Sequence, residues 1–327
     1  MGSRLRALAV SVVAILLFIG PASAQDWPAR PLTLVVAFPS GGSDDILGRI
    51  VAARLSELLG QPVIVENVSG GGGSTGTARV ATAAPDGYQL MLGTSATHAL
   101  SQVLRRNPPY DSTADFIPVA LIAEQPFILI ARKDLPVEGL REFITYAQAP
   151  GIRMQYGSAG EGSATHLVCA LLNTAGRIEA KHMPYDGGPA SLRDLVAGRI
   201  DYFCPVVTIA IPQIENKGVK PIAILAKKRP PILADLATAS EQGLADFDAN
   251  TWFAVFLPKG TPARIVGILH AALMATMDTP GVQARLSQIG AHVVTPERRT
   301  PDYLRAFLQS EIDKWAAAIK SANVKVD

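Results

Sequence analysis

Strand patterns and helix patterns alternate along almost the whole chain. Short apolar runs such as Leu32–Phe38 read as buried strands, and the segments between them carry apolar residues at helical spacing. This alternation is typical of α/β folds in which helices flank mainly parallel sheets. The 327 residues exceed the usual size of a single core, so we predict an α/β fold with two lobes.

The predicted elements follow one another in a regular order. We expect strands at Leu32–Phe38, Val63–Glu66, Gln89–Gly93, Phe127–Arg132, Arg153–Tyr156, Ala180–Tyr185, Ile200–Val206, Val219–Ala226 and Trp252–Leu257. We expect helices from Ser43 to Gly60, at Thr77–Ala84, Leu140–Gln148, Ser163–Thr174 and Pro189–Ala197, after Pro262, and at Pro301–Ser321.

Two segments have the pattern of crossings between lobes. Val119–Ala131 and Ala223–Asp235 each interrupt an apolar run with polar residues and proline. We therefore assign residues 25–125 and 229–327 to the first lobe and residues 126–228 to the second. A cleft between two such lobes is a common place for a ligand.

The N-terminal segment resembles a secretory signal peptide. Arg4 and Arg6 precede an apolar run that is too short to span a bilayer, and Ala22-Ser23-Ala24 has the small residues of a cleavage site. We expect export and cleavage after Ala24. Removal of Arg4 and Arg6 from the 30 basic residues leaves 28, equal to the 28 acidic residues. A neutral mature chain argues against a nucleic-acid partner.

Two turns rich in glycine and serine join a predicted strand to a predicted helix, one in each lobe. They read "FPSGGSDD" from Phe38 and "YGSAGEGSATH" from Tyr156. Helix N-termini at the carboxyl ends of strands present unpaired N–H groups, and small residues allow a ligand to approach the backbone. We predict that the two turns face each other across the cleft and hold a small anion, which we expect to be a carboxylate. The hydroxyls that would add donors belong to Ser43, Ser158, Ser163 and Thr165.

Several features of these turns have a second interpretation. Glycine and serine are ordinary turn residues. The adjacent Asp44 and Asp45 either cap the following helix or meet a ligand amine, a ligand hydroxyl or a bridging water. The sequence alone does not assign either role to Asp44 or to Asp45.

Other motifs point weakly to enzymes. The run Gly71–Gly76 satisfies a dinucleotide fingerprint, but the next strand does not end in an acid, and we expect no cofactor. The same run satisfies the hydrolase pattern G-x-S-x-G through Ser74, which leaves a secreted serine hydrolase as an alternative function. The five histidines show no metal-ligand spacing, so we expect no metal site.

Five segments in order resemble the Bug-type periplasmic receptors, the solute-binding components of tripartite tricarboxylate transporters. They are "WPARPLTLVVAFPSGGSDDILGRIVAARLSELLGQPVIVEN", "GGGGSTGTARVATAAPDGYQLMLGT", "PYDSTADFIPVALIA", "YGSAGEGSATHL" and "MPYDGGPASLRDLVAGRIDYF". The resemblance implies a Venus-flytrap fold similar to type II, a periplasmic location and the capture of a small carboxylate. It also implies delivery to membrane permease subunits and no enzymatic activity. We expect a monomer. A ligand sensor without a transport role is a further alternative.

The resemblance also implies a set of ligand-binding residues. The first turn corresponds to Phe38 through Asp45 and the second to Ser158 through His166, and two further loops are similar to cleft loops of the family. The resulting candidates are Phe38, Pro39, Gly41, Gly42, Ser43, Asp45, Ser95, Thr97, Ser158, Ala159, Gly162, Ser163, Thr165, His166, Tyr185 and Gly187.

Cys169 and Cys204 are the two cysteines of the chain. In an exported protein they can form a disulfide, and the alternative is a pair of buried thiols. The fold implied by the resemblance places Cys169 on the helix after the second turn and Cys204 at the end of a nearby strand. We therefore expect a bridge within the second lobe.

Overall fold

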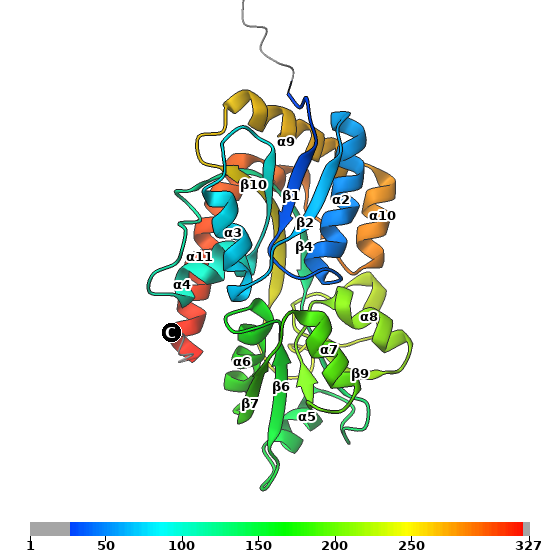
Figure 1. The fold of residues 1–327 in the computed structure, drawn as a ribbon. Helices are drawn as coiled ribbons and strands as arrows, with labels where there is room; N and C mark the ends of the chain where they lie inside the picture. The colour runs from blue at the N-terminus through cyan, green and yellow to red at the C-terminus, as the bar shows by residue number, and fades with distance from the viewer. Residues whose placement is uncertain (1–26, 323–327) are drawn as a thin grey trace, which may run out of the picture.

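The computed structural model of the chain describes residues 27–322 and places them in two lobes, each built on one sheet (Figure 1). Helices flank both sheets, so the predicted two-lobed α/β fold is confirmed. The predicted signal peptide and its cleavage site lie outside the described residues.

The first lobe combines the beginning and the end of the described chain. Its elements are β1 (Leu32–Val36), α2 (Ser43–Leu59), β2 (Val63–Asn67), η1 (Gly71–Gly73), α3 (Ser74–Ala81), β3 (Gln89–Thr94), η2 (Ser95–Leu100), α4 (Ser101–Leu104), β4 (Phe116–Pro126), β10 (Asn250–Pro258), α9 (Ala263–Met277), α10 (Pro280–Gln288), β11 (His292–Val293), η4 (Pro296–Arg299) and α11 (Pro301–Ala322). The sheet order is β11-β4-β10-β3-β1-β2.

The second lobe is formed by the middle of the chain. Its elements are β5 (Ile128–Arg132), α5 (Leu140–Ala147), β6 (Met154–Ser158), α6 (Ala164–Gly176), β7 (Ala180–Pro184), α7 (Gly188–Val196), β8 (Tyr202–Phe203), α8 (Val207–Glu215) and β9 (Val219–Ile224), followed by η3 (Pro231–Leu233). The sheet order is β7-β6-β8-β5-β9.

Both sheets are mixed, which differs from the expected mainly parallel arrangement. β1 pairs in parallel with β2 and β3, and β6 pairs in parallel with β7 and β8. The strands next to the crossings pair antiparallel, as β4 does with β10 and β5 does with β9. The chain passes between the lobes once in each direction, and this reversal explains the antiparallel pairs.

The two crossings are hydrogen-bonded to each other. Phe127 separates β4 from β5, its N–H donates to the carbonyl of Ala249 over 3.2 Å, and its carbonyl accepts from the N–H of Leu225 over 2.8 Å. The N–H of Ala249 donates to the carbonyl of Leu225 over 2.6 Å. These paired segments form a narrow connection at which the lobes can rotate.

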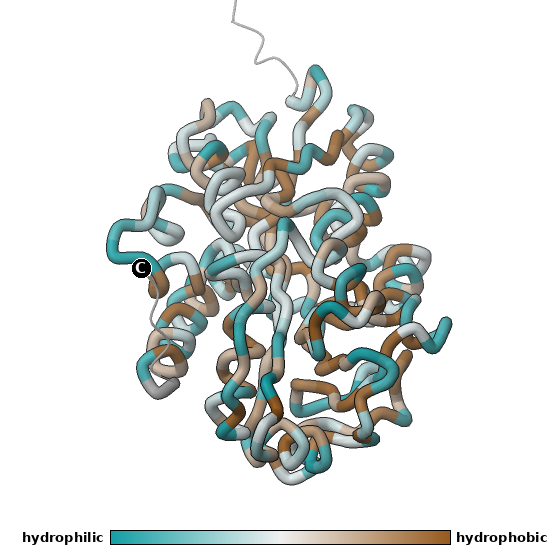
Figure 2. The backbone as a smooth tube through the Cα atoms, turned by 60° about the horizontal axis from the view of Figure 1, so that its bottom comes forward, coloured by the Kyte–Doolittle hydropathy of each residue, from teal (hydrophilic) through white to brown (hydrophobic). Residues whose placement is uncertain are grey.

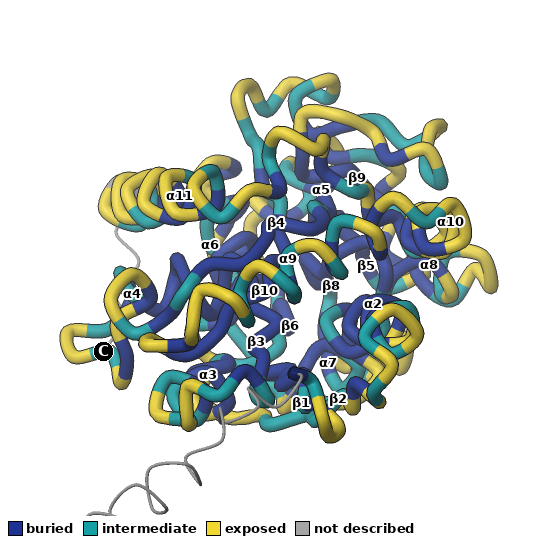
Figure 3. The backbone as a smooth tube through the Cα atoms, turned by 90° about the horizontal axis from the view of Figure 1, so that it is seen from above, coloured by how far each residue is buried: buried dark blue, intermediate teal, exposed yellow. Residues whose placement is uncertain are grey.

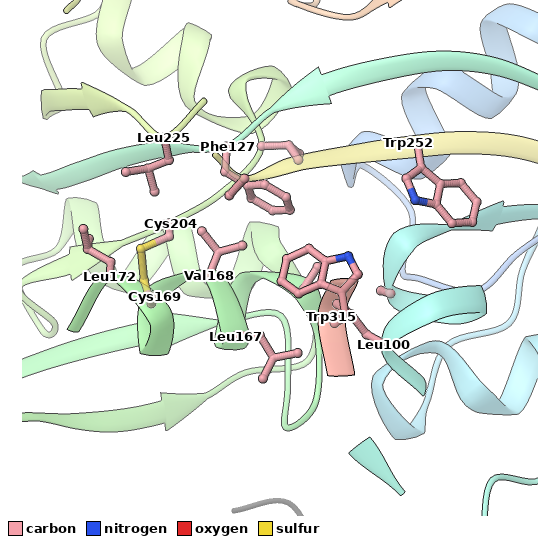
Figure 4. Packing of buried hydrophobic residues seen from close by; sticks show 14 of the residues in the cluster. Leu100, Phe127, Leu167, Val168, Cys169, Leu172, Cys204, Leu225, Trp252 and Trp315 are labelled. Atoms are coloured by element: carbon pink, nitrogen blue, oxygen red, sulfur yellow. A yellow bond between two sulfur atoms is a disulfide. The ribbon is translucent and has the colours of Figure 1, made fainter. Parts of the chain in front are cut away.

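Helix α11 contacts both lobes. Trp315 lies between Val168 of α6 and Leu100 of η2 (Figure 4). The indole N–H groups of Trp252 and Trp315 both donate to the buried carboxylate of Glu311, over 3.0 and 3.2 Å. The C-terminal helix therefore contacts both lobes beside the connecting segments, since Trp315 and Ala249 line the same surface pocket.

Apolar residues lie mainly inside the lobes. The central strands are buried, whereas the edge strands β2, β7 and β11 are partly exposed. The outer faces of α2, α10 and α11 are exposed (Figure 3), and the outer helices alternate apolar and polar positions along their turns (Figure 2). Within residues 27–322 no single helix has both the length and the apolar character to cross a membrane. The one pair of helices that does so together, α9 and α10, is bent by 69° between them.

Helix α8 was not predicted from the sequence. Its β-branched residues and the internal Pro212 disfavour a helix, and the preceding strand is shorter than expected. Val207, Ala210 and Ile211 are buried on one face, so tertiary packing overrides the local preference.

The predicted disulfide is confirmed. Cys169 of α6 and Cys204, which follows β8, are bridged and fully buried. Both belong to the second lobe, and Figure 4 shows the bridge beside Leu172 and Val168. The bridge therefore braces one lobe and leaves the connection between the lobes free.

Candidate functional site

The first turn joins β1 to α2. Gly41 has φ of +80°, a conformation that favours glycine, and Gly42 is the N-cap of α2. Because Gly42 has no side chain, no cap residue accepts from the first-turn N–H groups of α2. These N–H groups are therefore available to a bound anion.

Asp45 supports this turn from behind. Its carboxylate accepts from the N–H of Gly41 over 2.9 Å and from the hydroxyl of Ser40 over 3.1 Å, and it pairs with Arg49 over 2.8 Å. Burial by itself would raise the pKa of Asp45, but these donors outweigh burial and the pKa lies below its ordinary value. Asp45 is a charged structural residue of the turn.

The second turn joins β6 to α6. Ser163 is the N-cap of α6 and accepts from the N–H of His166 over 3.3 Å. The hydroxyl of Thr165 accepts from the N–H of Ala159 over 2.8 Å, and the N–H of Gly162 donates to Nδ1 of His166 over 3.3 Å. The side chains of the turn thus hold its shape and leave the N–H groups of Ala164 and Thr165 at the start of α6.

A cavity lies between the two turns, with about 530 Å³ of space free of protein atoms, part of it open to solvent. The first lobe and the second lobe each contribute a turn and further wall residues. The lining residues are Phe38, Pro39, Gly42, Ser43, Asp44, Thr94, Ala96, Phe127, Ala159, Ser163, Ala164, Thr165, Gly188, Pro189, Val206, Ile209, Thr251 and Phe253.

Asp44 differs from Asp45 in position and in the direction of its pKa shift. It lines the cavity, and one carboxylate oxygen accepts from the hydroxyl of Ser43 over 3.1 Å. Burial raises the pKa of Asp44 to about 6 against the opposing effect of the hydrogen bonds, and the nearby charge of Asp45 raises it further. Of the two acids that the sequence could not distinguish, Asp44 is the one that reaches the cavity.

Seven of the predicted binding residues line the cavity. They are Phe38, Pro39, Gly42, Ser43, Ala159, Ser163 and Thr165. Nine others do not line it, namely Gly41, Asp45, Ser95, Thr97, Ser158, Gly162, His166, Tyr185 and Gly187.

The polar side chains among these nine are bonded within the protein. Ser95 bonds the hydroxyl of Thr251 over 2.9 Å and so orients a lining residue. Thr97 and Thr94 form a capping box at the start of η2. Ser158 bonds Nε2 of His182 over 2.7 Å, and the hydroxyl of Tyr185 donates to Asp194 over 2.8 Å.

Several lining residues were not predicted. Phe127 and Val206 lie at the connection between the lobes, Thr251 and Phe253 lie on β10, and Ile209 lies on α8. Hydrophobic periodicity identifies such residues as core, because a cavity wall and a packed core have the same apolar pattern. Only the way in which the two lobes face each other shows which of these apolar residues line a cavity and which are packed in a core.

His166, His182 and Glu161 cluster beside the second turn. The two imidazoles are stacked, with 3.8 Å between their centroids and 8° between their planes, and their Nδ1 atoms lie 3.9 and 3.6 Å from the carboxylate of Glu161. Two rings in parallel planes cannot both direct an in-plane lone pair at one ion. Burial lowers the pKa of both histidines, to about 4 for His182, so the pair is neutral at pH 7.

Ser74 has a structural environment. Its hydroxyl donates to the carbonyl of Gly71 over 2.9 Å, and the side chain is buried at the start of α3. All five histidines bond, pair or stack elsewhere: His98 contacts Phe256, His166 and His182 stack on each other, His270 bonds the carbonyl of Val119, and His292 lies 3.4 Å from the carboxylate of Glu124. No general base therefore reaches Ser74 within the described residues.

The glycine-rich loop closes the mouth of the cleft. Residues 70–73 lie opposite Gly160 and Glu161 around a second cavity. A Cβ atom on Gly187 would lie 2.9 Å from Pro39 of the other lobe, so the lobes also meet there. The structure is that of a closed cleft.

Residues 47–324 match the family described as "Tripartite tricarboxylate transporter family receptor". Among solved structures, MatC from Rhodopseudomonas palustris with bound malate is 38% identical, with a TM-score of 0.85 over 90% of this chain and 100% of MatC. A second R. palustris protein, with adipate, is 35% identical, with a TM-score of 0.87 over 92% and 99%. The periplasmic binding protein BugD is 34% identical, with a TM-score of 0.87 over 91% and 99%.

Proposed function

Because the chain belongs to the receptor family of the tripartite tricarboxylate transporters, we propose that it captures a small organic carboxylate between its two lobes. The observation that carries this proposal is the cavity that both strand-to-helix turns line. The receptors of this family are solute-binding proteins, and the hydrolase alternative through Ser74 is not favoured.

The carboxylate would bind between the N-termini of α2 and α6. The first-turn N–H groups of both helices supply donors on opposite sides, and the hydroxyls of Ser163 and Thr165, which bond each other over 3.0 Å, retain one further donor between them. Each charge-assisted hydrogen bond contributes roughly 1.5–3 kcal/mol. Donors from both lobes act together only when the cleft is shut, so binding stabilises the closed state.

Two of the relatives support this ligand class. MatC holds malate, and the second R. palustris protein was solved with adipate. The absence of arginine from both turns agrees with a site in which backbone N–H groups carry the anion. The family further supports a periplasmic location after export, and it suggests that the receptor delivers its ligand to membrane permease subunits.

The test uses one filling substitution from each lobe. Ala96 and Ala164 line the cavity and are buried, so Ala96→Leu and Ala164→Leu would occupy the space of the ligand. A thermal-shift screen of the mature protein against aliphatic, aromatic and amino acids selects ligands, and calorimetry measures affinity. Each variant is expected to lower affinity at least 100-fold.

Ala175→Leu is the matched control. Ala175 is exposed on α6, the helix that also carries Ala164, and it lies outside the cavity. The ligand affinity of Ala175→Leu is therefore expected to equal that of the wild type. Wild-type affinity in both cavity variants, with unchanged midpoints of thermal unfolding, would show that the ligand binds elsewhere. Loss of affinity in only the cavity variants supports the proposal.

A further inference from the structure

The charges around the cavity restrict the ligand beyond its carboxylate. Asp44 is the sole charged residue among the described residues that line the cavity. The second cavity, at the mouth, adds Glu161 and Asp186, and again no lysine, arginine or histidine among the described residues lines it. The charged side chains that a ligand can meet in the closed cleft are therefore acids.

Two arginines close to the cleft are occupied within the protein. Arg49 lies on the helix that begins at the cavity, but it pairs with the buried carboxylate of Asp45 over 2.8 Å. Arg105 donates to the carbonyl of Gly71 over 2.8 Å and lines neither cavity. A second carboxylate on the ligand would have no cationic partner and would meet Asp44 instead.

Asp44 offers an acceptor beside the anion donors. It is in the first turn of α2, next to the N–H groups proposed to bind the ligand carboxylate. The hydroxyl of Ser43 is the single side chain described as donating to it, and it reaches only one of the two oxygens. A partly buried carboxylate with spare acceptor capacity favours a cationic donor on the ligand.

The remaining walls are mainly apolar, and Thr94 and Thr251 are the hydroxyl residues among them. Phe127 and Val206 at the connection, Phe253 on β10 and Ile209 on α8 surround the cavity together with Phe38. Burial of an aliphatic or aromatic group against such walls contributes about 25 cal/mol per Å² of apolar surface. A polar chain between two carboxylates would gain less from these walls.

We propose that the ligand is a zwitterionic amino acid with an apolar side chain. Its carboxylate binds the N–H groups of the two turns, its ammonium group pairs with Asp44, and its side chain lies against Phe127, Val206 and Phe253. An α-amino acid carries its ammonium group on the carbon next to the carboxylate, which suits an acidic side chain adjacent to the N–H groups of a helix N-terminus. This inference rests on the proposed function and specifies the ligand of the same site.

The test compares ligands that differ only at the α-position. L-Leucine, 2-hydroxy-4-methylpentanoate and 4-methylpentanoate share the same carboxylate and side chain. At the α-carbon, the first carries an ammonium group, the second carries a hydroxyl group, and the third carries neither. L-Valine, L-methionine and L-phenylalanine extend the amino-acid arm, and malate and adipate form the dicarboxylate arm. Calorimetry at pH 7.5 is expected to show at least one amino acid binding 10- to 100-fold more tightly than its deaminated analogue and than either dicarboxylate.

Asp44→Asn connects this preference to the side chain. It is expected to weaken amino-acid binding 10- to 100-fold and to remove most of the preference over the deaminated acid. Asp302→Asn makes the same charge change at an exposed residue that lines neither cavity and is expected to alter affinity less than 3-fold. An unchanged preference in Asp44→Asn would overturn the inference.

The comparison of amino acids with dicarboxylates distinguishes failure of this inference from failure of the proposed function. Tight binding of adipate or malate that Ala164→Leu abolishes, with weak binding of every amino acid, would overturn the inference and leave carboxylate capture intact. Amino-acid binding that both cavity-filling variants leave unchanged would overturn the proposed site itself.

Discussion

A Cβ atom added to Gly72 would lie 2.9 Å from the carbonyl oxygen of Glu161, although the two residues belong to different lobes. The glycine-rich loop thus contacts the second turn directly, backbone to backbone, in the closed cleft. Gly72 also has φ of +65°, which side chains rarely adopt. The loop is therefore part of the closing surface.

Gly72→Ala is expected to hinder closure, because its methyl group meets the carbonyl of Glu161 only when the lobes are shut. We expect ligand affinity to fall about 10-fold by calorimetry and stability to fall by about 1 kcal/mol from backbone strain. The control is Gly60→Ala, since Gly60 has φ of +66° and nothing within 4 Å of an added Cβ. Equal loss of affinity in both variants would show that strain, and not closure, is responsible.

Asp44→Asn is expected to stabilise the ligand-free protein at neutral pH. Burial raises the pKa of Asp44 from 3.8 to about 6, so the folded state favours the protonated acid. The stability contributed by the protonated form is fully present below about pH 4 and is lost as the pH rises through 6. Two pKa units correspond to an upper limit of about 3 kcal/mol.

Urea unfolding of the wild type and of Asp44→Asn checks whether the substitution raises the free energy of unfolding. The two proteins should be equally stable at pH 4, and the variant should become progressively more stable from pH 5 to pH 7.5. A variant that is less stable than the wild type at pH 7.5 would show that ionised Asp44 has a favourable partner in the ligand-free protein.

Removal of the disulfide is expected to lower stability without changing ligand affinity. Cys169 and Cys204 are 35 residues apart, and closing such a loop contributes about 4 kcal/mol in the chain-entropy treatment. The expected loss in Cys169→Ala/Cys204→Ala is of this size in urea unfolding, while calorimetry should give wild-type affinity. Reducing agent should reproduce the loss of stability in the wild type and leave the double variant unaffected. A large change in the ligand affinity of the double variant would contradict a role of the disulfide that is confined to one lobe.

Glu124 and Arg298 form an ion pair that ties β4 to η4. Arg298 donates to both carboxylate oxygens of Glu124, and His292 lies 3.4 Å away. Burial alone would raise the pKa of Glu124, but these partners lower it to about 2. The pair therefore contributes stability that is present above about pH 4.5 and is lost as the pH falls toward 2.

Glu124→Gln is expected to cost about 2 kcal/mol at pH 7, since Arg298 loses a partner at a site that is largely shielded from water. The difference from the wild type in urea unfolding should shrink between pH 4.5 and pH 2.5. The control is Asp302→Asn, because the pair of Asp302 with Arg305 is exposed and contributes little. A constant difference at all pH values would exclude the ion pair as its source.

The local sequence determined much of this protein. Hydrophobic periodicity predicted most helices and strands, and glycine and serine after two strands marked the turns that meet at the cavity. These features follow from backbone conformation and from the burial of single faces, which short segments encode. Helix α8 was not predicted because the packing of Val207 and Ile211 outweighs its unfavourable local preference for a helix.

Tertiary structure decided which residues of those turns face the cavity. Asp44 and Asp45 are adjacent and chemically identical, yet one lines the cavity and the other pairs with Arg49 behind the turn. Successive helical residues point about 100° apart, so their roles depend on where the opposite lobe and the neighbouring side chains lie. Likewise Phe127, Val206 and Phe253 read as core in the sequence, and they become cavity walls only because two lobes meet there.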